Sequence, residues 1–200
     1  VTQPVVGIGH FEPLKHYAEV HLLLEPNLGG KGDVEVASRV STNELPLHWQ
    51  NLILSHVLEK DQPGVLTGAY LSNIRITLVA GRGHEKHTTG GDFREATYRA
   101  IRQGLMEARA KGQAVLLEPM YEFEIMTDPV SSGRILNDLS RLEASSMTTI
   151  QDQGVLIKGR GPAATLRGYE REVRAITRGE GQIRTEFSGY DRCHDQEVIL

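Results

Sequence analysis

The stretch Asp92–Lys111, DFREATYRAIRQGLMEARAK, carries the clearest helical pattern in the chain. Its apolar and small residues recur at steps of three and four, which predicts an amphipathic helix with one buried stripe. The stripe includes residues with little or no side chain, namely Ala96, Ala100 and Gly104. Small residues let a neighbouring backbone approach closely, so we expect this helix to pack against a β-sheet.

Both ends of the predicted helix carry termination signals. Asp92, with Glu95 three residues later, is typical of a capping box at the N-terminus, with Asp92 as the cap. Gly112 predicts the C-terminus, because glycine readily adopts the left-handed conformation that ends many helices.

Strands are predicted on the N-terminal side of this helix. Alternation of apolar and polar residues over 17–26 and 74–80 is typical of half-buried strands, and a shorter strand is predicted at 34–40. Residues 47–60 have apolar side chains at helical spacing, and Pro63-Gly64 ends that pattern. The first half is therefore predicted to combine a sheet with two helices.

The second half places its predicted elements in a defined order. Strands are predicted near 121–125, 147–151, 154–160 and 182–190, and helices near 131–142 and 166–178. The resulting order, β-α-β-β-α-β, is that of the split βαβ or ferredoxin-like layout. We therefore expect an α+β fold with two domains, residues 1–114 and residues 115–200.

The composition is that of a globular chain of 200 residues, with 24% charged residues and a formal net charge of −4. A negative total excludes a protein that binds nucleic acid over its whole surface, but it allows a local basic face. The single cysteine, Cys193, forms no intramolecular disulfide, and no apolar run reaches the roughly 18 residues of a spanning helix. We expect a cytoplasmic chain without a membrane partner, and, because it opens at Val1, a piece of a longer protein.

Two histidines close together in sequence raise the question of a metal site. His84 and His87 are three residues apart, whereas the H-E-x-x-H motif of zinc enzymes needs a spacing of four on a helix. No third ligand is evident, and Cys193 is far away in sequence. Two polar loop histidines are the favoured interpretation, and we expect no metal; a small metal-dependent enzyme using His84, Glu85 and His87 stays open as a remote alternative.

The glycine-rich segment Leu28–Gly32 could suggest a phosphate-binding loop. The pattern G-x-x-x-x-G-K-[ST] is absent, because Lys31 is followed by Gly32 and Asp33 and no hydroxyl stands where magnesium would need one. We therefore expect no nucleotide site and no cofactor in this chain.

Basic residues cluster around the start of the predicted helix. Arg82, Lys86 and His87 precede it, and the helix N-terminus adds free N–H groups and a positive dipole, so this end could meet RNA phosphates. The helix also carries Arg94, Arg102 and Arg109, and the second half carries Arg160, Arg167, Arg171, Arg174 and Arg178. On the charge pattern alone, a solvated, ion-paired surface is the favoured interpretation of the helix arginines, and the second-half cluster has the same two interpretations.

Several segments, taken in order, resemble elongation factor G. LLEPMYEFEIMTD (116–128) and GRILNDL (133–139) resemble the strand and helix that open its fifth domain. LRGY (166–169) and RAITRGEG (174–181) resemble later segments of that domain, and YAEVHLLLEP (17–26) resembles the first strand of its fourth domain. GRGH (81–84) stands where the fourth domain has G-S-Y-H at its tip.

The resemblance extends over nearly the whole chain, from about residue 10 to residue 191. GHFEPLKHYAEVHLLLEP (9–26) and HTTGGDFREATYRAIRQGL (87–105) are similar to the subgroup related to tetracycline-resistance ribosomal protection proteins. The chain departs from the family pattern at Gly83, which replaces an aromatic residue, and at Glu180, which replaces an arginine.

The resemblance implies a module like the second domain of ribosomal protein S5, followed by a ferredoxin-like domain. It also implies a ribosome-binding fragment of a translational GTPase, which contacts ribosomal RNA in translocation or ribosome remodelling. GTP and magnesium are then held by a domain outside this chain. The fragment itself is then no enzyme, its partner is the ribosome, and we expect a monomer. Tetracycline protection is the alternative that the second subgroup implies.

The residues expected to contact ribosomal RNA lie in two segments. Arg82, His84, Lys86 and His87 belong to one loop, and Lys31 belongs to the glycine turn, which we expect to neighbour that loop. We further expect the loop to be exposed, with Phe93 and Ala96 buried behind it.

Overall fold

The structure is a computed structural model, and it describes residues 1–151 and 154–199. It divides into two compact units. Unit 1 comprises Val1–Leu116 together with the residues from Cys193 onward, and unit 2 comprises Leu117–Arg192. The expected division after residue 114 lies two residues from this boundary, whereas the C-terminal residues group with unit 1 and not, as expected, with the second domain.

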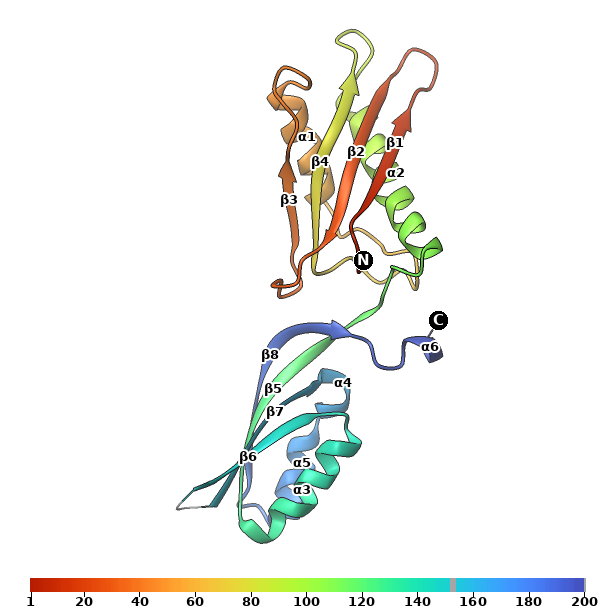
Figure 1. Cartoon of the computed structure of the whole chain (residues 1–200). Helices are drawn as coiled ribbons and strands as arrows, with labels where there is room; N and C mark the ends of the chain where they lie inside the picture. Colours follow the sequence, from red (N-terminus) through yellow and green to blue (C-terminus); the bar gives the residue numbers. More distant parts are fainter. Residues whose placement is uncertain (152–153, 200) are drawn as a thin grey trace. The chain divides into compact units, whose positions relative to one another are not determined.

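Unit 1 is a four-stranded sheet with two helices on one face (Figure 1). In spatial order the strands are β1 (Val5–Phe11), β2 (Ala18–Pro26), β4 (Ile74–Gly83) and β3 (Val34–Ser38), and the helices are α1 (Leu47–Leu58) and α2 (Gly90–Ala110). β1, β2 and β4 are antiparallel, and β3 runs parallel to β4. The mixture of sheet and two helices confirms the sequence prediction for this half.

The core of unit 1 lies between the sheet and the helices. The side chains of β2 alternate between buried and half-buried, as predicted from their polarity. Fully buried side chains include Leu22, Leu24, Ile53, Ile76 and Phe93. Full burial of each such side chain contributes about 1.5–3 kcal/mol, so this apolar layer is the main source of stability for unit 1.

Strand β1 was not predicted, because its inward positions include glycines. A Cβ atom added at Gly9 would lie 1.7 Å from the carbonyl oxygen of Ala96, and one added at Gly7 would lie 2.0 Å from that of Ala100. The backbone of β1 therefore lies directly on the small residues of α2. The expected close approach of this helix to a sheet is confirmed, with β1 as the strand concerned.

Side chains of α2 also cover the outer edge of β1. The Ile8 N–H donates to Oε1 of Gln103 at 2.9 Å, and Arg99 donates to the carbonyl oxygen of His10 at 2.9 Å. Two backbone groups on this edge, the Ile8 N–H and the His10 carbonyl, are thus satisfied by side chains.

Helix α2 begins earlier than its sequence suggested. Its N-cap is Thr89, and the carboxylate of Asp92 accepts the Thr89 backbone N–H at 2.7 Å. Asp92 therefore occupies the third helical position of the capping box, and the predicted pairing of Asp92 with Glu95 is wrong. The two glycines after Thr89 hid the true start, because glycine is a poor helix former.

Unit 2 is a second four-stranded sheet, and its neighbouring strands are all antiparallel. In spatial order the strands are β6 (Ser145–Gln151), β7 (Gly154–Pro162), β5 (Leu117–Thr127) and β8 (Gln182–Arg192). The helices are α3 (Pro129–Arg141), α4 (Ala163–Leu166) and α5 (Tyr169–Ile176), and α6 (Gln196–Ile199) belongs to the C-terminal residues of unit 1. The chain order of unit 2 is the split βαβ layout, so the predicted α+β fold class is confirmed.

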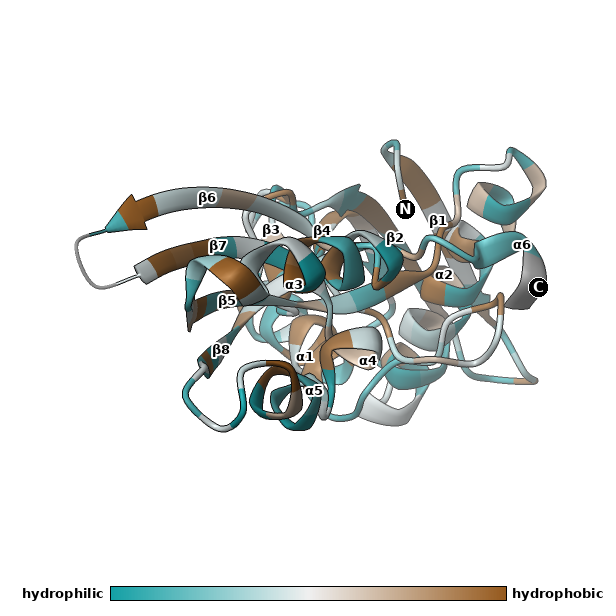
Figure 2. Ribbon diagram, turned by 90° about the horizontal axis from the view of Figure 1, so that it is seen from below, coloured by the Kyte–Doolittle hydropathy of each residue, from teal (hydrophilic) through white to brown (hydrophobic). Residues whose placement is uncertain are grey.

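The helices of unit 2 differ from the prediction in their ends. Gly168, with φ of 83°, separates α4 from α5, where one helix over 166–178 was predicted. Helix α3 is capped by Asp128, whose carboxylate accepts the N–H groups of Val130 and Ser131 at 2.8 Å each. Both α3 and α5 carry hydrophilic and hydrophobic residues (Figure 2), and Ile135, Leu139 and Val173 are buried.

Candidate functional site

The predicted RNA-binding loop, His84–Thr89, joins β4 to α2 at one end of the unit 1 sheet (Figure 1). The loop that joins β1 to β2, residues 12–17, lies beside it. The register pairs Ala18 with Gly83, and the Tyr17 N–H donates to the carbonyl oxygen of His87 at 3.1 Å. Two loops that are about 70 residues apart in sequence therefore form one surface, which we call the two-loop tip.

The side chains of the loop are placed as expected. Arg82, His84, Lys86 and His87 are exposed, but Arg82 lies on strand β4, one residue before its end, and not, as expected, in the loop. Phe93, at the start of α2, is fully buried behind the loop, as is Ala96. A Cβ atom at Gly83 would lie 3.0 Å from the Phe93 ring and 3.1 Å from that of Trp49, so these rings fill the space of a side chain at position 83.

Hydrogen bonds within the loop define its shape. The N–H groups of His87 and Thr88 both donate to the carbonyl oxygen of His84 at 2.9 Å. The His84 N–H donates to the Thr88 hydroxyl at 2.7 Å, and this hydroxyl donates to the carbonyl oxygen of Tyr17 at 2.5 Å. The loop is therefore a closed turn that is tied to the neighbouring loop.

The two histidines form a stacked pair. The rings of His84 and His87 lie 4.6 Å apart, centroid to centroid, at an angle of 27°. Nδ1 of His84 accepts the Lys86 N–H at 3.2 Å. Within residues 1–151 and 154–199, no three histidine, cysteine or acidic side chains come together in an arrangement that could hold a metal ion. The remote alternative of a metal-dependent enzyme gains no support from this geometry.

The two-loop tip contains a hollow of about 550 Å³. Its lining residues are Glu12, Leu14, Lys15, His16, Tyr17, Arg82, Gly83, His84 and His87. Leu14 is fully exposed at the end of its loop, with φ of 53°, a conformation that a leucine rarely adopts. Lys15 is exposed and adds a cation that sequence reasoning missed. The signal that was missed is the hairpin formed by β1 and β2. Because β1 was not predicted, residues 12–17 could not be placed as the loop of that hairpin.

Lys31 lies at the other end of the sheet. The β2–β4 register runs from Ala18 opposite Gly83 to Pro26 opposite Ile74, and the turn that contains Lys31 follows Pro26. This length of strand spans about 30 Å. The expectation that Lys31 neighbours the loop is therefore wrong, because antiparallel pairing places the two turns at opposite ends of the sheet.

The N-terminus of α2 is occupied by the protein's own carboxylate. Asp92 is 4% exposed, and its Oδ2 also lies 3.0 Å from Nδ1 of His16. Burial raises the pKa of Asp92, but the hydrogen bonds from Thr89 and His16 outweigh burial and lower this pKa overall. Because an anion already fills this position, the helix N-terminus does not add to the positive surface as expected.

Two of the three arginines that the sequence singled out on α2 also have partners within unit 1. Nε of Arg94 lies 3.0 Å from Oε1 of Glu59, and Arg109 donates to the carbonyl oxygen of Val65 at 3.1 Å. Hydrogen bonds from Tyr98 and His56 lower the pKa of Glu59 to about 2, and burial together with Glu59 raises the pKa of Tyr98 to about 12. These contacts link α1 to α2, and for Arg94 and Arg109 they favour a structural role.

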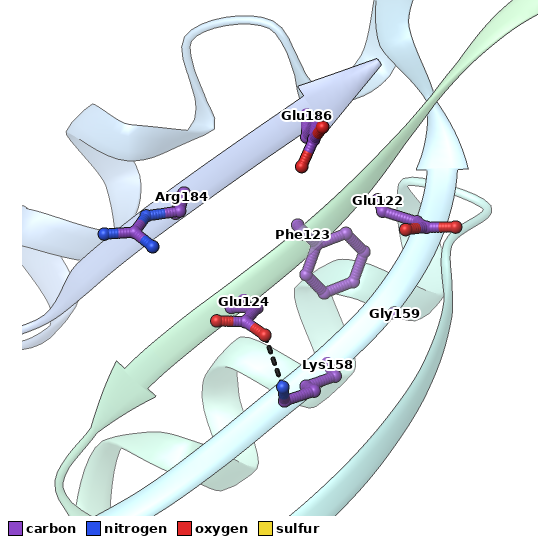
Figure 3. Close-up of a pocket in the computed structure, with 7 residues that line it drawn as sticks. All are labelled: Glu122, Phe123, Glu124, Lys158, Gly159, Arg184 and Glu186. Atoms are coloured by element: carbon purple, nitrogen blue, oxygen red, sulfur yellow. Dashed lines mark hydrogen bonds and ion pairs between the residues drawn. The ribbon is translucent and has the colours of Figure 1, made fainter. Parts of the chain in front are cut away.

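Unit 2 offers a different surface, on the sheet around β5 (Figure 3). A hollow of about 400 Å³ is lined by the carboxylates Glu122, Glu124 and Glu186 and by the cations Lys158 and Arg184. Lys158 forms an ion pair with Glu124 and lowers the pKa of that carboxyl. Since carboxylates outnumber cations here, this surface is poorly suited to phosphate groups.

Two arginines of the second half are likewise ion-paired. Arg160 donates to Asp191 at 2.8 Å, and Arg174 donates to Glu170 at 2.7 Å. Across the described part of the chain, the two-loop tip is therefore the stronger candidate for an RNA-binding surface. No helix among the described residues is both long enough and apolar enough to cross a membrane.

Comparison with known proteins identifies the two units. The family model described as "Elongation factor G, domain IV" matches residues 9–109, and that described as "Elongation factor G C-terminus" matches residues 115–198. A crystal structure of a Thermus thermophilus protein covers 100% of this chain and 30% of its own, with a TM-score of 0.86. At 23% sequence identity, this likeness shows the fold.

Two curated relatives are similar over most of the chain. "Elongation factor G 1" of Syntrophomonas wolfei is 30% identical over 182 residues, which are 89% of this chain and 25% of that protein. "Tetracycline resistance protein TetP" of Clostridium perfringens is 32% identical over 176 residues, which are 87% of this chain and 26% of that protein. The chain thus spans about a quarter of the length of these relatives. Since the domain IV match alone spans half of the chain, the chain belongs to the elongation factor G family.

Proposed function

We propose that this chain binds the ribosome, and that the two-loop tip of unit 1 contacts ribosomal RNA. The observation that carries this proposal is the group of exposed cations, Arg82 and Lys86, beside the stacked histidines at the end of the unit that matches domain IV of elongation factor G. The chain then acts in the cytoplasm as the ribosome-binding part of a translational GTPase.

The chemistry of the loop fits RNA. Arg82 and Lys86 offer exposed cations for phosphate oxygens, and the stacked His84 and His87 rings offer a flat surface for a base or a ribose edge. The closed turn holds these groups in place before binding, which reduces the entropy lost on association.

GTP hydrolysis is assigned to a part of the parent protein outside this chain. The glycine-rich turn after β2 leads into strand β3, whereas a phosphate-binding loop leads into a helix. Asp33 at the end of this turn would also repel a phosphate group. GTP and magnesium therefore do not fit the residues of this turn, and we assign no step of GTP hydrolysis to this chain.

Co-sedimentation with purified ribosomes tests the proposal. The combined variant Arg82→Ala, Lys86→Ala and His87→Ala should bind ribosomes at least roughly tenfold more weakly, because hydrogen bonds from charged groups are lost. Lys86→Ala and Lys31→Ala form a matched pair, since each removes one lysine from opposite ends of the same sheet. Lys86→Ala should weaken binding and Lys31→Ala should not. Equal binding by the native chain and the combined variant would reject the two-loop tip as the contact.

Ribosomal protection against tetracycline is the second candidate function. The similarity to the resistance protein of C. perfringens, at 32% identity, favours it. Expression of the parent gene in a tetracycline-sensitive host should then raise drug tolerance. Unchanged tolerance, with the protein present at a normal level, would leave a role in translocation as the remaining candidate.

A further inference from the structure

The hydroxyl of Thr88 has a position that the proposed contacts with RNA do not explain. Thr88 is half-buried beneath the loop, whereas the four proposed contact residues are exposed. Its Oγ1 accepts the His84 N–H at 2.7 Å and donates to the carbonyl oxygen of Tyr17 at 2.5 Å. A single oxygen therefore connects the first residue of one loop to the last residue of the other.

These bonds bear directly on the stacked histidines. Thr88 fixes the backbone of His84, and the Lys86 N–H holds the His84 ring through Nδ1 at 3.2 Å. The Tyr17 N–H, which donates to the carbonyl oxygen of His87 at 3.1 Å, fixes the backbone that carries the second ring. A shift of either backbone segment would separate rings whose centroids now lie 4.6 Å apart.

We infer that Thr88 is the positioning residue of the two-loop tip: its hydroxyl sets the orientation of His84 against His87 for RNA binding. This inference rests on the proposed function. Thr88 itself makes no contact with RNA in this proposal. Its hydroxyl affects RNA binding only through the positions of His84 and His87.

Three variants separate this role from a general effect on folding. Thr88→Val keeps the shape of the side chain and removes the hydroxyl. Thr88→Ser keeps the hydroxyl and should restore the native behaviour. Thr67→Val removes a hydroxyl from an exposed turn, where it accepts the Ala69 N–H at 3.4 Å, and serves as the matched control.

Two measurements are made on each variant. Backbone ¹⁵N relaxation of residues 84–88 reports the order of the loop without any ribosome. Co-sedimentation with purified ribosomes reports binding. Thr88→Val removes both hydrogen bonds of the hydroxyl and should lower the order parameters of the loop. Because the histidines must then be ordered on binding, affinity for the ribosome should fall roughly three- to tenfold. Thr88→Ser and Thr67→Val should match the native chain in both measurements.

The outcomes that oppose the inference are distinct. An ordered loop in Thr88→Val would show that the hydroxyl does not position it, and a disordered loop with native binding would show that its order is irrelevant to RNA. If the native chain itself failed to bind ribosomes, the proposed function would be rejected, and with it the binding role of Thr88. The relaxation data would still decide whether the hydroxyl orders the loop.

Discussion

Asp92 shows how one side chain can serve two loops. Its carboxylate is nearly buried, accepts the Thr89 N–H, and lies within hydrogen-bond distance of His16. It therefore caps α2 and also holds the β1–β2 loop against the start of that helix. The sequence predicted an acidic residue with a capping role here, but the partner had to come from the structure.

Replacing Asp92 should identify the true capping pair. Asp92→Ala should lower the free energy of unfolding by about 1 kcal/mol, as for other lost N-terminal caps. Glu95→Ala is the control, since Glu95 is exposed and outside the observed cap, and it should change stability by less than about 0.5 kcal/mol. Urea denaturation measures both. A larger loss for Glu95→Ala would support the pairing predicted from sequence.

The lowered pKa of Asp92 also predicts a dependence of stability on acid. The pKa of Asp92 is lower in the folded chain than in the unfolded chain, where it is about 3.9. The ionised carboxylate therefore stabilises the fold at pH values above about 3.9, and this contribution is lost as the pH falls through the pKa of the folded state. The unfolding free energy of the native chain should therefore fall between pH 5 and pH 2 more steeply than that of Asp92→Asn. Parallel curves for the two proteins would contradict the lowered pKa.

At the scale of elements, the contact between β1 and α2 depends on glycine. Gly9→Ala would place a methyl group against the helix backbone, and overpacking of this kind costs about 1–3 kcal/mol. Gly29→Ala is the control, because a Cβ atom there meets nothing within 4 Å, and its effect should stay below about 0.5 kcal/mol. Thermal unfolding distinguishes the two, and equal stabilities would contradict the close approach.

The elements that the sequence predicted well are those with a regular apolar period. β2, β4, α2 and β5 follow this rule, and their type and place are confirmed. β1 escaped prediction because its inward positions carry no side chain at Gly7 and Gly9. The single helix predicted over 166–178 is interrupted at Gly168, whose left-handed backbone the apolar period could not reveal.

The candidate site was predicted only where it depends on the local sequence pattern. The loop with His84, Lys86 and His87 follows a predicted strand, which carries Arg82 near its end, and precedes a predicted helix, so its exposure could be inferred. The distance of Lys31 from this loop and the nearness of Lys15 both depend on which strands pair. Strand pairing joins residues that are far apart in the chain, and the local apolar pattern of each strand does not say which other strand lies beside it.

For the whole molecule, the charge of the two-loop tip predicts how binding responds to salt. Each phosphate contact releases counterions, so ribosome binding should weaken as salt rises. Removing one contact with Lys86→Ala should reduce the slope of log affinity against log salt by about one unit. Lys31→Ala should leave the slope unchanged. Equal slopes for the native chain and Lys86→Ala would show that Lys86 makes no phosphate contact.

The coverage of β1 by Gln103 and Arg99 has a consequence for solubility at high concentration. An open strand can recruit an extended segment from another molecule, and repeated recruitment builds fibrils. Here the Ile8 amide and the His10 carbonyl already hold side-chain partners. At these two positions the helix that completes the core of unit 1 also opposes the addition of a further strand to its sheet.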